Sequence, residues 1–531
     1  MCLAFYRLCG LLSEAQLQDR RGWGGVGETL GVETGLRGRA GLAGVAAAAV
    51  ALGVAELVAV VTGPRTAPLV AVGGLIIDNV PEPLKDFAIS VFGVYDKVAL
   101  ITGTLVLLAA FAAGLGILGL RGVWICYAGI TAFGLLGALA AVTRHDAGPA
   151  AALPSIVGTA AAIALAWLLL RPAAVAGHDR RRFLRIAGGA LGAAVVGGLA
   201  GRWLAASRGV AVERASVTLP AAADPAPALP AEADLGLRGL TPFVTPTADF
   251  YRIDTAIVIP QVSPETWRLR IHGRVRNPIT LTFEELLNRP MIERYTTLSC
   301  VSNEVGGDLV GNARWLGVPL KNLLDEVAPE EGADQVVSRS VDGFTAGTPT
   351  AALRDGRDAM LAIAMNGEPL PVKHGFPVRM VVPGLYGYVS ATKWLAELEL
   401  SSFADFDAYW IPRGWAQQAP IKTSSRIDTP RVSSEPRPGP VTVAGVAWAQ
   451  RRGISRVEVR VDDGPWNEAT LAAVPSIDTW RQWSWTWQAT AGSHRLAVRA
   501  TDNAGEVQTD QRRSPAPDGS SGWHAIEVTI R

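Results

Sequence analysis

The sequence predicts a multidomain protein with three structured parts: an N-terminal transmembrane helix bundle, a mixed α+β domain and a C-terminal immunoglobulin-like β-sandwich. Long apolar stretches are confined to the first 207 residues. Short strand-like and helix-like segments alternate after residue 240, and regularly spaced β-type segments begin at about residue 425. A chain of 531 residues is long enough for several domains.

The composition excludes several classes of protein. The 49 basic and 48 acidic residues nearly cancel, so a nucleic-acid partner, which needs a basic surface, is not expected. Only four cysteines occur, at Cys2, Cys9, Cys126 and Cys300, and none has the spacing of a zinc finger, a c-type haem site or an iron–sulfur cluster. Cys300 is the only cysteine after residue 207, so no disulfide is expected within that part of the chain.

Residues 41–207 are poor in charge and predict about five membrane spans. A transmembrane helix needs about 20 mostly apolar residues. The segments that meet this length are 41–63, 97–120, 122–143, 150–170 and, more weakly, 186–206. The stretch 67–80 is too short to cross and predicts a re-entrant or interfacial piece. Glu56, inside the first span, is either a proton site or a partner for a neighbouring helix. The N-terminal tail, 1–40, has no clear pattern.

Basic residues predict the orientation of the spans, because cytoplasmic loops are rich in Lys and Arg. Arg37 and Arg39 precede the first span, Arg121 lies between the second and third, and a basic cluster at 171–185 precedes the last. We therefore expect a multi-pass protein of the cytoplasmic membrane, in contact with membrane lipid, with its C-terminal half on the extracytoplasmic side.

The soluble half begins with a Pro- and Ala-rich stretch, 208–240, that predicts an extended linker. A mixed α+β domain is expected over 241–424. Within it, residues 267–273 alternate as a β-strand does. Thr282 followed by Glu285 three residues later predicts a capped helix start.

Four motifs in this domain occur in the order seen in one known family. They are Tyr295-Thr-Thr-Leu-Ser-Cys300-Val-Ser-Asn303, Gly311-Asn312-Ala-Arg314-Trp315, the stretch from Met365 through His374 to Arg379, and Lys393-Trp394. Upstream, Phe250-Tyr251-Arg252-Ile253-Asp254 occupies the place of a pterin-contact segment. Together these residues resemble the sulfite oxidase family of molybdopterin-dependent oxidoreductases over residues 241–531.

The resemblance implies a molybdenum–molybdopterin cofactor and assigns roles to individual residues. Cys300 would be the metal ligand, and soft thiolate suits molybdenum. The catalytic set would be Cys300, Arg252, Phe344 and Tyr388, and the cofactor-binding set Tyr251, Arg252, Asp254, Asn303, Asn312, Arg314, His374, Arg379 and Lys393. Arginine, lysine and histidine suit the phosphate and polar rings of the pterin.

Each of these residues also has a plainer interpretation. A lone cysteine is more often a small buried hydrophobe than a ligand. His374, followed by glycine, could be a turn residue, and Trp315 and Trp394 are expected in the core. A charged Arg379 in an apolar strand would be costly to bury without an anion, which favours cofactor contact.

Departures from the family pattern concern the substrate. Phe344 stands where sulfite oxidases have a tyrosine, and Tyr388-Val389-Ser390 stands where they have an arginine shortly before the Lys-Trp pair. Glu304 and Val305 replace basic residues. A less cationic pocket makes sulfite a doubtful substrate. We expect two-electron oxygen-atom transfer on a small oxyanion or sulfoxide-like molecule, with electrons passing to a separate carrier or, through another subunit, to the quinone pool.

The segment Arg180-Arg181-Arg182-Phe183-Leu184, followed by an apolar run, resembles a twin-arginine export signal. Such signals serve proteins that fold around a cofactor before they cross the membrane. The alternative is a basic cluster that follows the positive-inside rule. The residue order, together with a cofactor-type domain downstream, favours the export signal.

Residues 425–531 predict an immunoglobulin-like sandwich. Its expected strands start near Val441, Ile454, Trp480 and His494. The region resembles the dimerisation domain of sulfite oxidases and implies a possible homodimer through 425–531. Two other functions remain open: a sulfoxide reductase-type molybdoenzyme that runs oxygen transfer in reverse, whose relatives lack this domain, and a non-catalytic membrane receptor.

Overall fold

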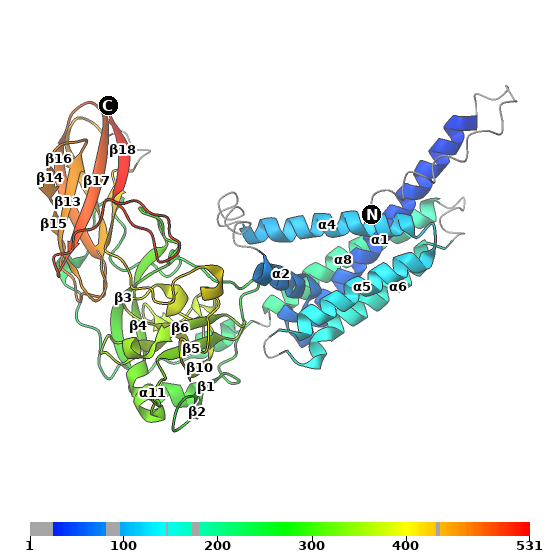
Figure 1. Cartoon of the computed structure of the whole chain (residues 1–531). Coiled ribbons are helices and arrows are strands. Elements are labelled where there is room, and N and C mark those ends of the chain that lie inside the picture. The colour runs from blue at the N-terminus through cyan, green and yellow to red at the C-terminus, as the bar shows by residue number, and fades with distance from the viewer. Residues whose placement is uncertain (1–24, 81–95, 145–146, 172–179, 208, 432–435) are drawn as a thin grey trace. The chain divides into compact units, whose positions relative to one another are not determined.

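The computed structural model describes residues 25–80, 96–144, 147–171, 180–207, 209–431 and 436–531. The chain divides into two compact units, Met1–Ser207 and Arg208–Arg531, and each is described by itself. The first unit is helical and the second is built mainly from β-strands (Figure 1). Cys2 and Cys9, and most of the expected N-terminal tail, lie outside the described residues.

The first unit consists of α1 (Gly25–Thr62), α2 (Pro68–Asn79), α4 (Asp96–Leu118), α5 (Val123–Val142), α6 (Leu153–Leu169) and α8 (Arg180–Ser207). Five of these contain segments long and apolar enough to span a membrane: Gly35–Thr62, Ala99–Leu118, Val123–Val142, Pro149–Leu169 and Arg180–Leu204. They coincide with the five spans expected from the sequence. The Arg180–Arg185 cluster forms the first turns of α8.

Glycine lets these helices approach one another closely. A Cβ atom on Gly44 of α1 would lie 2.0 Å from the carbonyl oxygen of Ala112 in α4. At Gly158 of α6 the corresponding distance to the carbonyl oxygen of Ala51 in α1 is 2.5 Å. Small residues at helix interfaces are the usual means of close packing between membrane helices. The backbones of α1, α4 and α6 are therefore in direct contact.

The sequence predicts two further features of the helical unit only in general terms. Glu56 pairs with Arg202 of α8, with 3.4 Å between Oε1 and Nη2, which matches the interpretation of this carboxylate as a partner for a neighbouring helix. The stretch after residue 67 forms α2, a helix of 12 residues that is too short to span a bilayer.

The second unit starts with a mixed domain of two β-sheets. The first sheet has the order β2-β1-β10-β5-β6, made of β2 (Ile279–Thr282), β1 (Arg268–Gly273), β10 (Leu395–Ser401), β5 (Gln335–Ser340) and β6 (Thr345–Pro349). The second has the order β3-β4-β7-β8, made of β3 (Ile292–Ser299), β4 (Val310–Pro319), β7 (Met360–Met365) and β8 (Glu368–Pro369), with β9 (Arg379–Val381) paired to β7.

Short helices complete this domain. Helix α10 (Phe283–Leu287) begins with the capping box expected at Thr282 and Glu285, in which both reciprocal hydrogen bonds are present. Helix α11 (Leu320–Val327) buries four apolar side chains in a core shared by both sheets. The strand predicted over 267–273 is β1.

The Pro- and Ala-rich segment before the domain lies against it. Residues Ala211–Ser216 form a short helix, α9, and Arg214 donates hydrogen bonds to the carbonyl oxygens of Pro369 and Leu370 at 2.6–3.1 Å. Asp224 pairs with strand β3 through a backbone hydrogen bond from Glu293. Composition alone predicts an extended chain here and misses both the helix and the docking.

Two four-stranded sheets form the C-terminal part. One has the order β11-β12-β16-β15, made of β11 (Ser424–Thr429), β12 (Gly439–Trp448), β16 (Arg481–Ala489) and β15 (Thr470–Leu471). The other has the order β14-β13-β17-β18, made of β14 (Trp466–Glu468), β13 (Ile454–Val461), β17 (Gly492–Asp502) and β18 (His524–Ile530). Side chains from both sheets, among them Val443, Trp483 and Val498, share one apolar core.

Candidate active site

A pocket in the mixed domain brings together side chains that are distant in sequence. It encloses about 930 Å³ of empty space, part of which is open to solvent. The predicted site residues that line it are Tyr251, Asp254, Cys300, Phe344, His374, Arg379, Tyr388 and Lys393. The segment before β1, the end of β3, the turn before β6 and the residues around β9 all contribute to its wall.

Cys300 lies immediately after β3, at the start of the loop to β4. Its N–H donates to the carbonyl oxygen of Leu309 at 2.9 Å, and its own carbonyl oxygen accepts from the N–H of Asn303 at 3.1 Å. These bonds close the loop 300–309 across its base. Burial raises the pKa of the Cys300 thiol, while hydrogen bonds from the N–H and hydroxyl of Ser302 and the charge of Lys393 act against this rise.

Arg379 is a buried cation without a carboxylate partner among the described residues. It is 5% exposed, and its guanidinium donates only to the carbonyl oxygens of Met380, His374 and Ala391, at 3.3–3.5 Å. The guanidinium carbon lies 5.1 Å from the ring centroid of Trp315. Burial lowers the pKa of Arg379 to about 10. Such a charge is costly to bury without an anion, so the pocket favours an anionic ligand.

His374 lies beside this cation. The side chain is 1% exposed, and its Nε2 atom has no hydrogen-bond partner among the described residues. Burial and the charges of Arg379, Lys393 and Lys373 lower the pKa of His374 to about 3, so the ring is neutral at pH 7. The ring also contacts Phe250 edge-to-face, with 5.6 Å between centroids. His374 Nε2 is thus a second buried polar atom in the pocket wall for which a bound ligand would supply the hydrogen-bond partner.

Lys393, Asp254 and Arg252 form a charged group at the edge of the pocket. Lys393 Nζ lies 2.7 Å from Asp254 Oδ2, and both side chains are at least nine-tenths buried. Arg252, one-third exposed, binds the same carboxylate with two hydrogen bonds of 2.7 and 3.0 Å. Burial lowers the pKa of Lys393 to about 8, although Asp254 opposes this. Two cations share one carboxylate, which leaves the group positive.

An aromatic wall forms another part of the pocket. Phe344 and Tyr388 line it, together with Trp410 and Trp415. The ring centroids of Tyr388 and Trp415 are 5.7 Å apart, and those of the two tryptophans 6.2 Å. The Tyr388 hydroxyl donates to the carbonyl oxygen of Ala416 at 2.6 Å. The two tryptophans were missed from sequence because no motif contains them, although an aromatic cluster at 409–415 was visible.

Four predicted cofactor residues lie outside the lining of the pocket: Arg252, at its edge, and Asn303, Asn312 and Arg314. Asn303 accepts a hydrogen bond from the N–H of Leu309 at 2.8 Å and thereby shapes the cysteine loop. Asn312 is fully buried and bonds to Thr297 and to the carbonyl oxygen of Phe243. Arg314 is partly exposed and pairs with Glu293 at 3.4 Å. Their assignment as cofactor contacts therefore remains a prediction.

The structure corrects the sequence comparison at Val389, which lies in the segment that was matched to a substrate-side arginine of the family. It is 1% exposed, belongs to the apolar core and does not line the pocket. Its neighbour Tyr388 lines the pocket instead. An arginine at 389 would bury its charge among apolar side chains.

The C-terminal sheets hold the cysteine loop from the other side. Arg426 of β11 donates to the carbonyl oxygen of Gly307 at 2.7 Å, and the Ser520 hydroxyl donates to that of Asn303 at 2.6 Å. A Cβ atom on Gly306 would lie 2.2 Å from the His524 ring of β18. The loop that carries Cys300 is therefore fixed by both parts of the unit.

The donor set of the pocket fits a metal held by a large anionic organic group better than a metal held by the protein alone. No group of three or more His, Cys, Asp or Glu side chains that could hold a metal ion occurs within the described parts of the chain. Cys300 offers one soft anionic ligand. Arg379, His374 Nε2 and Lys393 offer donors for phosphate and polar rings.

Known proteins are similar in sequence to this domain. Residues 256–410 match the oxidoreductase molybdopterin binding domain family. Chicken (Gallus gallus) sulfite oxidase is 30% identical over 341 residues, which are 53% of this chain and 72% of the relative. Human (Homo sapiens) mitochondrial sulfite oxidase is 28% identical over 343 residues; the match spans 54% of this chain and 62% of the human protein. The solved sulfane dehydrogenase SoxCD from Paracoccus pantotrophus is 24% identical, with a TM-score of 0.48, over 54% of this chain and 83% of that one.

Proposed function

Since the chain belongs to the sulfite oxidase family of oxidoreductases, whose cofactor is molybdenum bound to molybdopterin, we propose that it is a membrane-anchored enzyme of two-electron oxygen-atom transfer. Cys300 is the metal ligand in this proposal. The substrate is a small molecule, and a separate carrier takes the electrons.

One observation carries the proposal. Cys300 shares a pocket with a buried guanidinium that has no carboxylate partner and a buried imidazole nitrogen that has no hydrogen-bond partner, among the described residues. An apolar core would not retain Arg379 and His374 in these states without a ligand that satisfies them. A phosphate-bearing pterin beside the cysteine would satisfy both.

The protein side chains have distinct roles in this mechanism. When bound, the cofactor supplies two-electron redox chemistry and exchange of an oxygen atom. Cys300 would bind the metal as the thiolate, and metal binding would offset the cost that burial places on its ionisation. Arg379 and the positive group of Lys393 and Arg252 would balance the negative charge of the pterin. His374, which is neutral, would present Nε2 to it. The aromatic wall excludes water from the substrate side.

Membrane attachment and sidedness belong to the same proposal. Five helices are long and apolar enough to span a membrane and serve as the anchor. The distribution of arginines between them, and the arginine pair at the start of α8, support an extracytoplasmic catalytic domain. The two C-terminal sheets would form an immunoglobulin-like domain through which a homodimer could assemble.

Substitution of Phe344 tests which substrate the pocket accepts. Sulfite is an anion that needs donors aimed at its oxygens, and the aromatic wall offers few, so wild-type turnover of sulfite should be slow. Phe344→Tyr adds one hydroxyl at the pocket and should raise kcat/KM for sulfite by about tenfold, since a preorganised donor can contribute ~10²–10³-fold. Phe406→Tyr, outside the lining, is the control.

The measurement is steady-state turnover of purified holoenzyme with sulfite, sulfoxides and N-oxides and an artificial electron dye. Metal and pterin analysis of the same preparation tests the cofactor. Protein that contains neither molybdenum nor pterin, when expressed in a host that makes the cofactor, would overturn the proposed function.

A further inference from the structure

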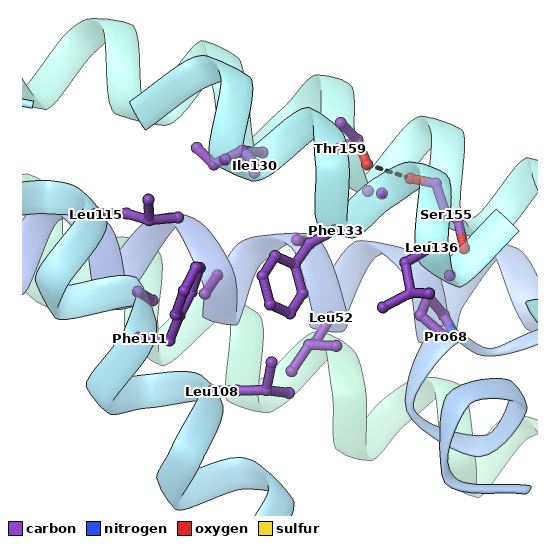
Figure 2. Close-up of a pocket in the computed structure, with 18 of the residues that line it drawn as sticks. Leu52, Pro68, Leu108, Phe111, Leu115, Ile130, Phe133, Leu136, Ser155 and Thr159 are labelled. Atoms are coloured by element: carbon purple, nitrogen blue, oxygen red, sulfur yellow. Dashed lines mark hydrogen bonds between the residues drawn. The ribbon is translucent and has the colours of Figure 1, made fainter. Parts of the chain in front are cut away.

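A large apolar cavity, partly open at the surface, lies among the helices of the first unit. It is bounded by α1, α2, α4, α5 and α6 and encloses about 1030 Å³ of empty space, part of it open to the surroundings. Figure 2 shows its apolar wall, with Leu52, Leu108, Leu115, Ile130 and Leu136 around a central pair of phenylalanines. Four of the bounding helices belong to the five that are long and apolar enough to span a membrane.

The close glycine contacts prevent this cavity from collapsing. Gly44 and Gly158 hold the backbone of α1 against α4 and α6, and both glycines also line the cavity. The helices cannot move nearer without a backbone clash. Apolar atoms that face empty space lose dispersion contacts, and this space is partly open to the surroundings, so an apolar molecule can enter and fill it.

One polar atom in the wall has no partner. Ser155, in the first turn of α6, is 3% exposed, and its Oγ atom has no hydrogen-bond partner among the described residues. It lies over Gly137 of α5, at 2.9 Å from where a Cβ atom of that residue would be. Thr159, by contrast, donates to the carbonyl oxygen of Ser155 at 2.6 Å (Figure 2). A buried unpaired hydroxyl costs ~1–3 kcal/mol, so the occupant should bring a hydrogen-bond acceptor.

Aromatic side chains define the shape that fits. Phe111 of α4 and Phe133 of α5 lie with ring centroids 4.8 Å apart at an interplanar angle of 46°, and both line the cavity (Figure 2). Aromatic rings favour contact with another planar ring. The cavity thus combines an apolar wall, a place for a flat ring and the unpaired Ser155 hydroxyl.

We propose that this cavity binds a membrane quinone. A quinone has a planar ring, carbonyl oxygens that accept from Ser155, and an apolar tail that suits the leucine-rich wall. An acyl chain would leave the Ser155 hydroxyl unpaired and would not stack as a planar ring on the two phenylalanines. A quinone also takes up two electrons and two protons to become a quinol, which equals the two electrons released per turnover; this last argument alone rests on the proposed function.

Photolabelling of the full-length protein in detergent tests the proposal. A short-chain azidoquinone is the probe, decylubiquinone the competitor, and mass spectrometry locates the label. We expect label on α4, α5 or α6 that decylubiquinone displaces. Ser155→Ala should weaken displacement about tenfold, the loss of one buried hydrogen bond. Leu108→Trp should abolish labelling by filling the cavity.

Matched controls separate the cavity from general effects. Thr131→Ala removes an exposed hydroxyl of α5, and Leu107→Trp adds the same bulk at a position 72% exposed; both should label as wild type. Labelling of Cys300→Ser should also be unchanged, which distinguishes failure of the cavity from failure of the catalytic proposal. Label outside the cavity, label in Leu108→Trp equal to wild type, or displacement by phosphatidylglycerol as effective as by decylubiquinone would overturn the quinone site.

Discussion

Arg379 shows at the scale of one residue how the pocket selects its ligand. Its three hydrogen bonds, all to backbone carbonyl oxygens and none shorter than 3.3 Å, leave a positive charge without a carboxylate partner in the part of the chain that the structure describes. Folding of the protein already removes water from this charge. The binding of an anion therefore carries no further cost for desolvating the arginine. The residue should therefore have opposite effects on folding and on cofactor retention.

We expect Arg379→Met to stabilise the cofactor-free protein and weaken the holoprotein. Removal of an unpaired buried charge should raise the free energy of unfolding of cofactor-free protein by roughly 1–3 kcal/mol. The same change should lower pterin retention at least tenfold, as measured by fluorescence of the released, oxidised pterin. Arg339→Met, which removes an arginine paired with Glu399 outside the pocket, is the control. Unchanged pterin content would show that Arg379 does not hold the cofactor.

At the scale of elements, the loop 300–309 depends on strands that follow it by more than 100 residues. Thr297 of β3 accepts from the N–H of Trp480 at 2.7 Å, and its carbonyl oxygen accepts from Gln450 at 2.9 Å. With the contacts of Arg426, Ser520 and His524, these bonds make the C-terminal sheets part of the support of the cysteine. A substitution where the C-terminal sheets contact this loop should therefore alter the position of Cys300, the proposed metal ligand.

Gly306→Ala is the sharpest test of this contact. Gly306 has φ +84°, and a Cβ atom would overlap the His524 ring, so alanine combines backbone strain with a clash. We expect a loss of roughly 2–4 kcal/mol in stability and a reduced molybdenum content. Gly356→Ala, with φ +83° and no heavy atom within 4 Å of the added methyl group, should cost only the strain, about 1 kcal/mol. Equal losses in the two variants would mean that the His524 contact contributes nothing.

Local patterns in the sequence were sufficient for much of the fold. The capping box at Thr282 and Glu285 concerns residues in one turn, and the alternation that predicts β1 concerns one strand, so neither depends on the rest of the molecule. The apolar helices follow from length and composition in the same way.

Contacts between distant segments could not be predicted. Trp410 and Trp415 enter the pocket because the chain after β10 folds back over it, and no local pattern records that path. Arg314 shares a motif with Asn312, yet it pairs with Glu293 at the surface while Asn312 bonds inside. Residue type indicated the chemistry of the site, whereas long-range packing decided which side chains face it.

At the scale of the whole molecule, we expect acid to lower the free energy of unfolding of the second unit through protonation of His524. The ring is partly buried, and its Nδ1 accepts from the N–H of Ile427 at 3.0 Å. Burial and Arg426 lower the pKa of His524 to about 4, from 6.5 in the unfolded chain. Between these values the unfolded chain binds more protons, so the free energy of unfolding falls as pH falls from about 6.5 to 4, by at most about 3 kcal/mol.

Thermal unfolding of the full chain in detergent across this pH range checks the effect. His524→Asn keeps an acceptor near the position of Nδ1 but cannot be protonated, so it should reduce the pH dependence of Tm between 4 and 6.5, while the part due to His374, whose pKa is also lowered, should remain. A variant as sensitive to acid as the wild type would assign the effect to other groups, such as His374.

The central claim is that Cys300 binds molybdenum, and X-ray absorption at the molybdenum edge tests it most directly. The holoprotein should lose one sulfur ligand in Cys300→Ser, while Cys126→Ser, which alters a buried cysteine of the helix bundle, should keep the wild-type count. Pterin content should be largely retained in both variants, because Arg379, His374 and Lys393 are unchanged. A Cys300→Ser protein that keeps its molybdenum with the same number of sulfur ligands as the wild type would contradict the account.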